Sequence, residues 1–184
     1  MNSVRILGID PGLRHTGWGV IVAEGSRLRA VGQGTISPDT KLPLSERLLC
    51  LHQGLGEVIQ AYQPEEAAIE ETFATQNGAS TLKLGHARAA GMLAAAAAEL
   101  PVSEYAPRLV KKAVVGTGSA DKTQIAAMVR QLLPSLPKTI SADAADALAV
   151  AITHAHHRTL MAHALPSYRA PHCQSWQSLA KVKP

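Results

Sequence analysis

Residues 4–20 read VRILGIDPGLRHTGWGV, and this stretch decides how the rest of the chain folds. The apolar run at residues 4–9 predicts a buried strand, which ends at Asp10 because a Pro-Gly pair follows it. Two glycines further along open a second strand, so the chain turns back at once. A carboxylate at the end of a buried strand lies at the edge of a sheet, where phosphate or a metal ion can reach it. The alternative is that Asp10 serves only as a turn residue.

The composition predicts one folded globular domain. The chain has 184 residues, of which 46% are hydrophobic and 17% are charged, and this length is enough to bury a substantial core. Aromatic residues make up only 3%, which argues against a single-stranded nucleic-acid binder built on aromatic stacking. The two cysteines stand in no metal-binding spacing, and neither a signal peptide nor a membrane-length apolar run is visible. We therefore expect a cytoplasmic protein without membrane contact.

The positive charge is concentrated at the C-terminus. The formal net charge is +4, and residues 158–184 carry four basic side chains and no acidic ones. Residues 1–157 are therefore neutral, with fourteen basic and fourteen acidic residues. If four of those acids gather around metal ions, the remainder of the domain is net positive. The charge balance is compatible with DNA binding but does not require it.

Turn residues and hydrophobic periodicity divide the chain into strands and helices. Three short strands form an antiparallel meander, and a helix then leads to a strand that we expect to run parallel to the first. The order predicts an α/β domain with a mixed sheet flanked by helices over residues 1–157, followed by a basic, flexible tail at 158–184. The predicted strands cover residues 4–9, 18–23, 28–36, 66–70 and 101–105. The predicted helices cover residues 44–63, 79–100, 107–115, 121–133 and 142–157.

The last predicted helix carries two aspartates on one face. Asp143 and Asp146 are about one helical turn apart, so both carboxylates can reach one metal ion or bridge to a second. The helix is apolar nearly all round, which predicts burial, and buried acids repel each other unless a cation compensates. The alternative is that both acids lie near the helix start because the helix dipole favours them there. This alternative explains Asp143 better than Asp146.

The strand at 66–70 contributes a further acid, but the residues alone leave two candidates. Glu70 and Glu71 are adjacent, so their side chains point to opposite faces and only one can join the other acids. Together with Asp10 and the two helical aspartates, either one completes a set of four oxygen ligands. Such ligands favour Mg²⁺ or Mn²⁺ over zinc, and four carboxylates suit two ions. In a two-ion site one ion activates water and the other stabilises the leaving oxygen of a phosphodiester.

Four basic residues lie within fifteen positions around a glycine-containing loop: Arg108, Lys111, Lys112 and Lys122. They are suited to contacting DNA phosphates from a helix face and a loop. The alternative is an ordinary solvated helix face. Phe73, the only phenylalanine, is either a core residue or an aromatic side chain at the mouth of the polar loop that follows it.

Six segments follow one another along residues 4–157: GIDPG with the following TGWG, AIEETF, LKLGHARA, EYAP, VKKAVVGTGSADK and DAADALAVAITH. In this order they resemble the RuvC Holliday-junction resolvase family. The resemblance implies a ribonuclease-H-like fold and a homodimer. It implies a Mg²⁺-dependent endonuclease that resolves four-way DNA junctions by paired symmetric nicks in opposite strands, in recombination and DNA repair. The products would carry a 5′ phosphate and a 3′ hydroxyl.

The resemblance also assigns catalytic and metal-binding roles to individual acids. The family's glutamate directly follows an Ala-Ile pair, which selects Glu70 over Glu71. The remaining family acids match Asp10, Asp143 and Asp146. These four carboxylates would bind two Mg²⁺ ions per subunit, with Mn²⁺ as a substitute.

Other matches concern DNA and partner proteins. Phe73 corresponds to an aromatic residue that contacts junction bases in the family. Lys111 and Lys122 correspond to basic residues near the scissile phosphate or the DNA backbone, and Arg108 and Lys112 are expected to add phosphate contacts. The family further implies the RuvA and RuvB branch-migration motor as a partner complex.

Two functions of other classes compete with this interpretation. One is a junction-binding protein that has lost cleavage and only presents DNA to partners, and the retention of all four acids argues against it. The other is a sugar-kinase-like or actin-like ATPase, which also begins with a Gly-x-Asp-x-Gly strand and turn. That class needs a second phosphate loop and a much longer chain, and the sequence contains neither.

Overall fold

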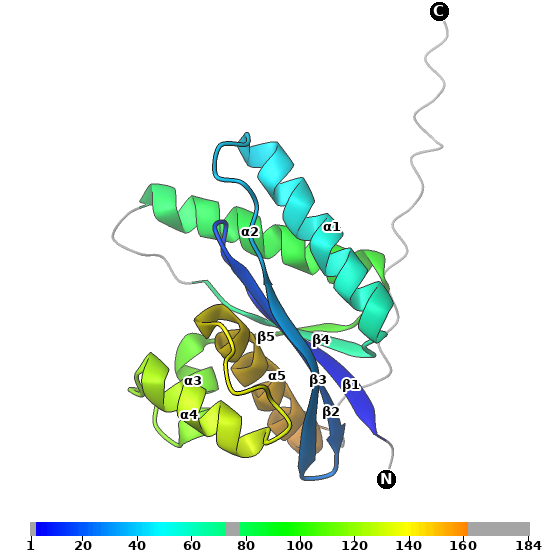
Figure 1. Cartoon of the computed structure of the whole chain (residues 1–184), viewed down its shortest axis with the longest axis vertical. Helices are drawn as coiled ribbons and strands as arrows, with labels where there is room; N and C mark the ends of the chain where they lie inside the picture. Colours follow the sequence, from blue (N-terminus) through cyan, green and yellow to red (C-terminus); the bar gives the residue numbers. More distant parts are fainter. Residues whose placement is uncertain (1–2, 73–77, 162–184) are drawn as a thin grey trace, which may run out of the picture.

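The computed structural model describes residues 3–72 and 78–161, which form a single mixed sheet of five strands with helices on both faces (Figure 1). The strand order is β3-β2-β1-β4-β5. β1, β2 and β3 are antiparallel neighbours, whereas β4 and β5 run parallel to β1. The predicted meander followed by parallel strands is confirmed. The strands are β1 (Val4–Asp10), β2 (Thr16–Glu24), β3 (Arg27–Ile36), β4 (Glu66–Glu70) and β5 (Val102–Tyr105).

All five predicted helices are present, with small differences at their ends. They are α1 (Leu44–Tyr62), α2 (Gly78–Ala97), α3 (Pro107–Val115), α4 (Lys122–Leu132) and α5 (Ala142–Met161). Ser141 caps α5, because its hydroxyl accepts a hydrogen bond from the Ala144 amide at 3.1 Å. The helix continues one turn past its predicted end at residue 157, so Arg158 belongs to α5 and not to the tail. Residues 162–184 lie outside the described part of the chain.

The helices cover the sheet in two unequal layers (Figure 1). α1 and α2 pack on one face, over a cluster that contains Leu7, Ile9 and Ile69. α3, α4 and α5 cover the other face, and the buried side chains of α5 pack on Ile6 and Ala68. The alternation of side chains along β1 and β4 therefore places the even-numbered residues toward α5.

Glycines in β1 and β2 allow α5 to lie unusually close to the sheet. A Cβ atom on Gly8 would overlap the Ala147 carbonyl oxygen, and one on Gly17 would overlap the carbonyl oxygen of Asp143. Gly17 is also the register partner of Asp10. The two glycines therefore bring the start of α5 directly against the end of β1.

α2 has a buried face of small residues and an exposed face. Ala87 and Ala90 are buried against Leu51 of α1, which identifies α1 as the intramolecular neighbour of α2. Leu82 and Leu93 point outward and are 67% and 61% exposed. None of the described helices is both long and apolar enough to cross a membrane.

Candidate active site

Two acids come from the carboxyl ends of neighbouring parallel strands. Ile9 of β1 lies opposite Ile69 of β4, so Asp10 and Glu70 leave the sheet at the same edge, and both point toward α5. Glu71 is past the end of β4, where its amide donates a hydrogen bond to the Tyr105 carbonyl oxygen at 2.9 Å. The structure thus brings Glu70, and not Glu71, to Asp10.

A small cavity of about 160 Å³ joins these acids to α5. Asp146 enters it from the second turn of α5, and Lys111 and Lys122 enter from α3 and α4. Apolar side chains of α3, α4 and α5 close the remaining walls. Three of the four predicted acids and two of the four predicted basic residues therefore line one cavity.

Burial and mutual repulsion leave two of the acids with strongly raised pKa values. The pKa of Asp10 is raised from 3.8 to about 8, first by burial and then by the negative charges of Glu70 and Asp146. The pKa of Glu70 is raised from 4.5 to about 7, again by burial first and by Asp146 next. Three ionised carboxylates in this small space need a cation nearby.

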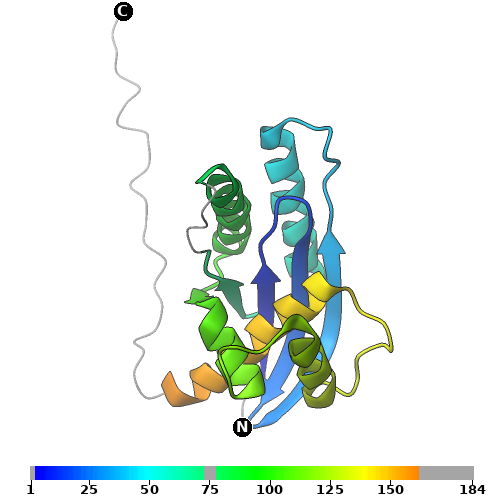
Figure 2. The same ribbon diagram turned by 90° about the vertical axis from the view of Figure 1, so that its left-hand side faces the viewer.

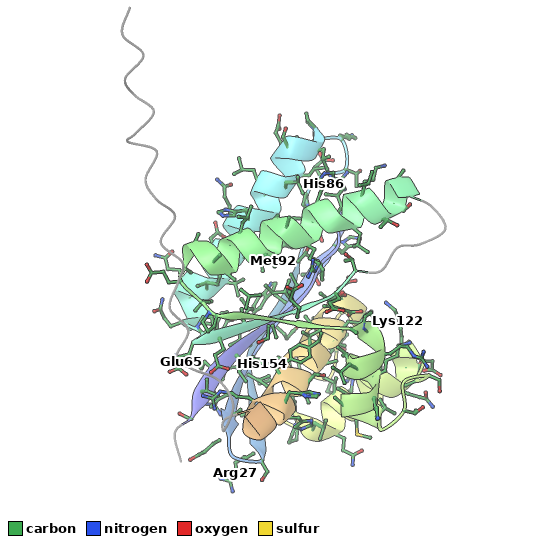
Figure 3. The ribbon with its side chains drawn as sticks, turned by 180° about the vertical axis from the view of Figure 1, so that it is seen from behind. Arg27, Glu65, His86, Met92, Lys122 and His154 are labelled. Carbon is green, nitrogen blue, oxygen red and sulfur yellow. The ribbon has the colours of Figure 1, made fainter. Side chains whose placement is uncertain are left out.

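Lys122 forms the one ion pair that the described residues make with an acid of this cavity. Its Nζ donates to a carboxylate oxygen of Asp146 at 3.0 Å, and this contact raises the pKa of the lysine. The lysine side chain is 76% exposed, and Figure 3 shows Lys122 at the edge of the α3–α4 layer that adjoins the sheet. One exposed ammonium group compensates only part of the negative charge.

The donor chemistry of the cavity fits a divalent metal ion. Its acids offer only carboxylate oxygens, the ligands that Mg²⁺ and Mn²⁺ prefer. As the side chains stand, no group of three or more His, Cys, Asp or Glu residues in the described ranges has closed into a metal-binding cluster.

Asp143 stands one turn earlier on α5 and lines a different, neighbouring cavity. Its charge nevertheless raises the pKa of Asp10 and of Lys122. The fourth predicted acid is therefore close enough to interact electrostatically with Asp10 and Lys122, although it does not line their cavity.

The predicted DNA-contacting residues have different surroundings. Lys111 and Lys122 line the carboxylate cavity. Arg108 and Lys112 lie one helical turn apart on α3 and are exposed outside it. Phe73 falls outside the described residues.

Comparison with known proteins identifies the family. The family model for crossover junction endodeoxyribonuclease RuvC matches residues 6–154. This chain belongs to the RuvC family. The crossover junction endodeoxyribonuclease RuvC of Maricaulis maris is 65% identical over 156 residues, which cover 85% of this chain and 93% of the relative. The RuvC protein of Caulobacter sp. strain K31 is 61% identical over 155 residues, which cover 84% of this chain and 91% of the relative.

Solved RuvC structures have the same architecture. Thermus thermophilus RuvC, solved in complex with a Holliday junction substrate, aligns with a TM-score of 0.79 and 35% sequence identity. The alignment covers 85% of this chain and 96% of the solved chain. The yeast mitochondrial Holliday junction resolvase Ydc2 aligns with a TM-score of 0.62 at 12% identity, which is a likeness of fold. These matches confirm the expected ribonuclease-H-like fold of the RuvC family.

Two polar residues of this RuvC chain were missed by the sequence argument. Arg47 of α1 donates to the Leu13 carbonyl oxygen at 2.8 Å and so supports the turn that follows Asp10. His154 of α5 is only 7% exposed and hydrogen-bonds to Tyr105 and Glu66. Each is a polar residue at a position where the helix pattern is apolar. Such a position predicts a buried side chain with hydrogen-bond partners, and this is the signal that could have identified both residues.

Proposed function

We propose that this chain is a structure-selective endonuclease that resolves four-way (Holliday) DNA junctions by paired symmetric nicks in opposite strands. Its place would be recombination and DNA repair in the cytoplasm. The observation that carries the proposal is the convergence of Asp10, Glu70 and Asp146 on one cavity with basic walls, in a chain of the RuvC family. Support comes also from a 35% identical RuvC that was solved with a Holliday junction substrate.

The proposed catalytic and metal-binding residues are Asp10, Glu70, Asp143 and Asp146. Their carboxylates would hold two Mg²⁺ ions per subunit, with Mn²⁺ as a substitute. When bound, such ions lower the pKa of an attacking water and stabilise negative charge on the leaving oxygen of the phosphodiester. The acids themselves hold negative charge at fixed positions. The raised pKa values of Asp10 and Glu70 show that this charge is unfavourable without compensation, and a bound cation would supply that compensation.

Basic side chains around this cavity would bring the DNA backbone to the acids. Lys111 and Lys122 stand at the cavity itself, where they attract the scissile phosphate. Arg108 and Lys112 are exposed on α3 and would contact phosphates further along the strand. Phe73 is proposed, on the family resemblance alone, to contact junction bases.

A homodimer would explain how two strands are cut symmetrically. A four-way junction is nearly two-fold symmetric, so a two-fold dimer presents one cavity to each of two opposite strands. The exposed face of α2 offers a surface for such contact, because its exposed residues recur at helical spacing and form an outward stripe of Leu82, His86, Ala89 and Leu93. The RuvA and RuvB motor proteins are the proposed partners in branch migration.

The first test compares two adjacent glutamates. Glu70→Gln is expected to lower the cleavage rate of an end-labelled synthetic four-way junction in Mg²⁺ by more than about 100-fold, since even changes around metal ligands cost 10–100-fold. Glu71→Gln changes the same charge one residue away and is the matched control, expected to stay near wild type. Cleavage is measured with Mg²⁺ and with EDTA, beside a linear duplex of the same sequence.

The outcomes separate the competing functions. Paired, Mg²⁺-dependent nicks that spare the duplex support the proposal. Junction binding by the wild-type protein without any cleavage would identify a non-catalytic junction binder instead. Equal rates for Glu70→Gln and the wild type would remove Glu70 from the catalytic set.

A further inference from the structure

A second, basic cavity lies beside the carboxylates. It has a volume of about 520 Å³, and it lies where the β1–β2 turn stands between the beginnings of α1 and α2 (Figure 2). Asp143 is part of its wall and also acts on the pKa of Asp10, so this cavity adjoins the carboxylate cavity. The other polar or charged side chains in its lining are Arg14, His15, Thr40, Arg47, Ser80 and Lys83.

Arg47 has hydrogen-bonding capacity that the described chain does not use. Its Nη2 donates to the Leu13 carbonyl oxygen at 2.8 Å. Its Nε is buried and has no hydrogen-bond partner among the described residues. Leaving a buried donor unpaired costs free energy, so such a group usually has a partner in the functioning molecule. A guanidinium group has five N–H donors in a planar fork, which matches two oxygens of a phosphate.

The charge of this basic cavity is uncompensated. Arg14, Arg47 and Lys83 form no ion pair with any residue that the structure describes. The single acid in the lining is Asp143, which we assign to the metal site. Three permanent positive charges around one concave space favour an anionic ligand.

The turn that carries Arg14 is held in place before any ligand arrives. The Thr16 hydroxyl donates to the Gly12 carbonyl oxygen at 2.7 Å and accepts from the Gly12 amide at 3.2 Å. The His15 ring is hydrogen-bonded to the Ser37 hydroxyl at 2.8 Å. A preformed basic cavity loses little conformational entropy when it binds.

We propose that this basic cavity binds a backbone phosphate of the DNA strand being cut, next to the scissile phosphate. The inference rests on the proposed junction cleavage and adds a binding site to it. A phosphodiester group is a singly charged anion with two free oxygens, which suits the arginine fork and its two flanking cations. Because such a contact sets the position of the strand without reading bases, it would align the scissile phosphate with the neighbouring carboxylates.

The experiment begins with two matched double variants. Arg14→Gln with Lys83→Gln removes two charges from the basic cavity and leaves Arg47 to support the turn. Arg27→Gln with Arg29→Gln removes two exposed charges around the β2–β3 turn, at the other end of β2 (Figure 3). In EDTA, the slope of log affinity for the junction against log salt should become shallower by about 0.9, the value for one lost phosphate contact, in the first variant only. Thermal unfolding checks that both variants remain folded.

Junctions in which one backbone phosphate is replaced by an uncharged methylphosphonate then locate the contact. We expect a single methylphosphonate at one position beside the scissile phosphate to weaken wild-type binding about tenfold, the effect of losing one charge-assisted contact. The same substitution should weaken binding to the R14Q/K83Q variant less than about twofold, because the contact is already absent. Arg47→Lys, which keeps the charge and loses the fork, should behave like R14Q/K83Q at this position.

The possible results distinguish this inference from the proposed function. Suppose that the wild-type protein cleaves junctions, and that a methylphosphonate at each position weakens its binding by the same factor as it weakens binding to R14Q/K83Q. The basic cavity then binds no phosphate. The same conclusion follows if the R27Q/R29Q variant shows an equal change in salt slope. If the wild-type protein neither binds nor cleaves junctions, it is the proposed function that fails.

Discussion

Asp10 and Glu70 hold protons at a pH where ordinary carboxyl groups have lost them. Burial is the main cause: it raises the pKa of Asp10 from 3.8 to about 8 and that of Glu70 from 4.5 to about 7, and the negative charge of Asp146 adds to both shifts. Across this range the folded chain binds more protons than the unfolded chain, so its stability falls as the pH rises. The slope reaches at most about 1.4 kcal/mol per pH unit for each group.

We therefore predict that the metal-free protein in EDTA loses thermal stability as the pH rises from 5 to about 8. Mg²⁺ should restore stability most strongly at the upper end, where both carboxylates are ionised and free to bind it. Asp10→Asn cannot titrate, and its Tm in EDTA should vary less with pH than the wild-type Tm. Parallel pH profiles for the two proteins would contradict the assignment of the raised pKa to Asp10.

The choice between Glu70 and Glu71 marks the limit of single-residue reasoning. The sequence identified both acids, and alternation along a strand required that only one face the site. Which face is buried against α5 depends on the register of β4 with β1 and on the Gly8 and Gly17 contacts, which join residues far apart in the chain. The family resemblance selected Glu70, and the structure brings that residue to Asp10.

At the scale of elements, the approach of α5 to the sheet determines where two of the acids lie. Gly8→Ala would place a methyl group against the Ala147 carbonyl oxygen and the Ala151 side chain. We predict a loss of about 1–3 kcal/mol in the free energy of unfolding, the usual cost of overpacking, together with slower cleavage because Asp146 moves with the helix. Urea unfolding and junction cleavage measure the two effects.

Gly85→Ala is the matched control for this substitution. A Cβ atom on Gly85 meets no atom within 4 Å, and glycine in a helix interior is less favourable than alanine by roughly 0.5–1 kcal/mol. The control should therefore be neutral or stabilising. A Gly8→Ala protein as stable as Gly85→Ala would show that α5 does not depend on close contact with β1.

The other end of α5 is held to the sheet by a polar cluster. His154 lies eight residues beyond Asp146, about 12 Å along the helix. Its Nε2 is 2.7 Å from a Glu66 carboxylate oxygen, and its Nδ1 is 2.8 Å from the Tyr105 hydroxyl. Arg158 donates to the second oxygen of Glu66 at 2.7 Å. Attraction here opposes the carboxylate repulsion at the start of the same helix.

Glu66→Gln is predicted to lower the free energy of unfolding by about 1.5–3 kcal/mol at neutral pH, the range for hydrogen bonds to a charged group. Although burial opposes ionisation, the bonds from His154 and Arg158 outweigh it and lower the pKa of Glu66. The stabilisation is therefore present above pH 4.5 and is lost as the pH falls through the folded pKa. Urea unfolding at several pH values tests this, with exposed Glu57→Gln as the control. A deficit in Glu66→Gln that persisted at low pH would point to packing instead of charge.

Local patterns predicted the elements but not this cluster. Strand alternation, the apolar repeat of α1 and the Ser141 cap are properties of neighbouring residues, and each was visible in the sequence. The partners of His154 lie 88 and 49 positions away, so no window around it reveals them. A histidine within a helix that is apolar all round nevertheless had to be buried, and a buried ring needs partners.

At the scale of the whole molecule, the two layers of helices divide the tasks. The α3–α5 layer surrounds the acids and bears the basic residues of α3 and α4, whereas the α1–α2 layer carries large apolar side chains that remain exposed. A row of exposed, mostly apolar side chains on one helix is a common site of subunit contact. The outward stripe of α2 would thus join two copies while leaving both carboxylate cavities open to DNA.

Leu93→Arg on α2 is predicted to convert the proposed homodimer into monomers at micromolar concentration, because it places a charge within the proposed contact. Leu49→Arg on α1 makes the same change at a comparably exposed leucine, 53% against 61%, and should leave the dimer intact. Sedimentation equilibrium measures both variants, and a junction assay should show that Leu93→Arg loses the pairing of its two nicks. If only Leu49→Arg dissociates, the interface lies on α1 and not on α2. If the wild-type protein sediments as a monomer, the proposed homodimer is wrong.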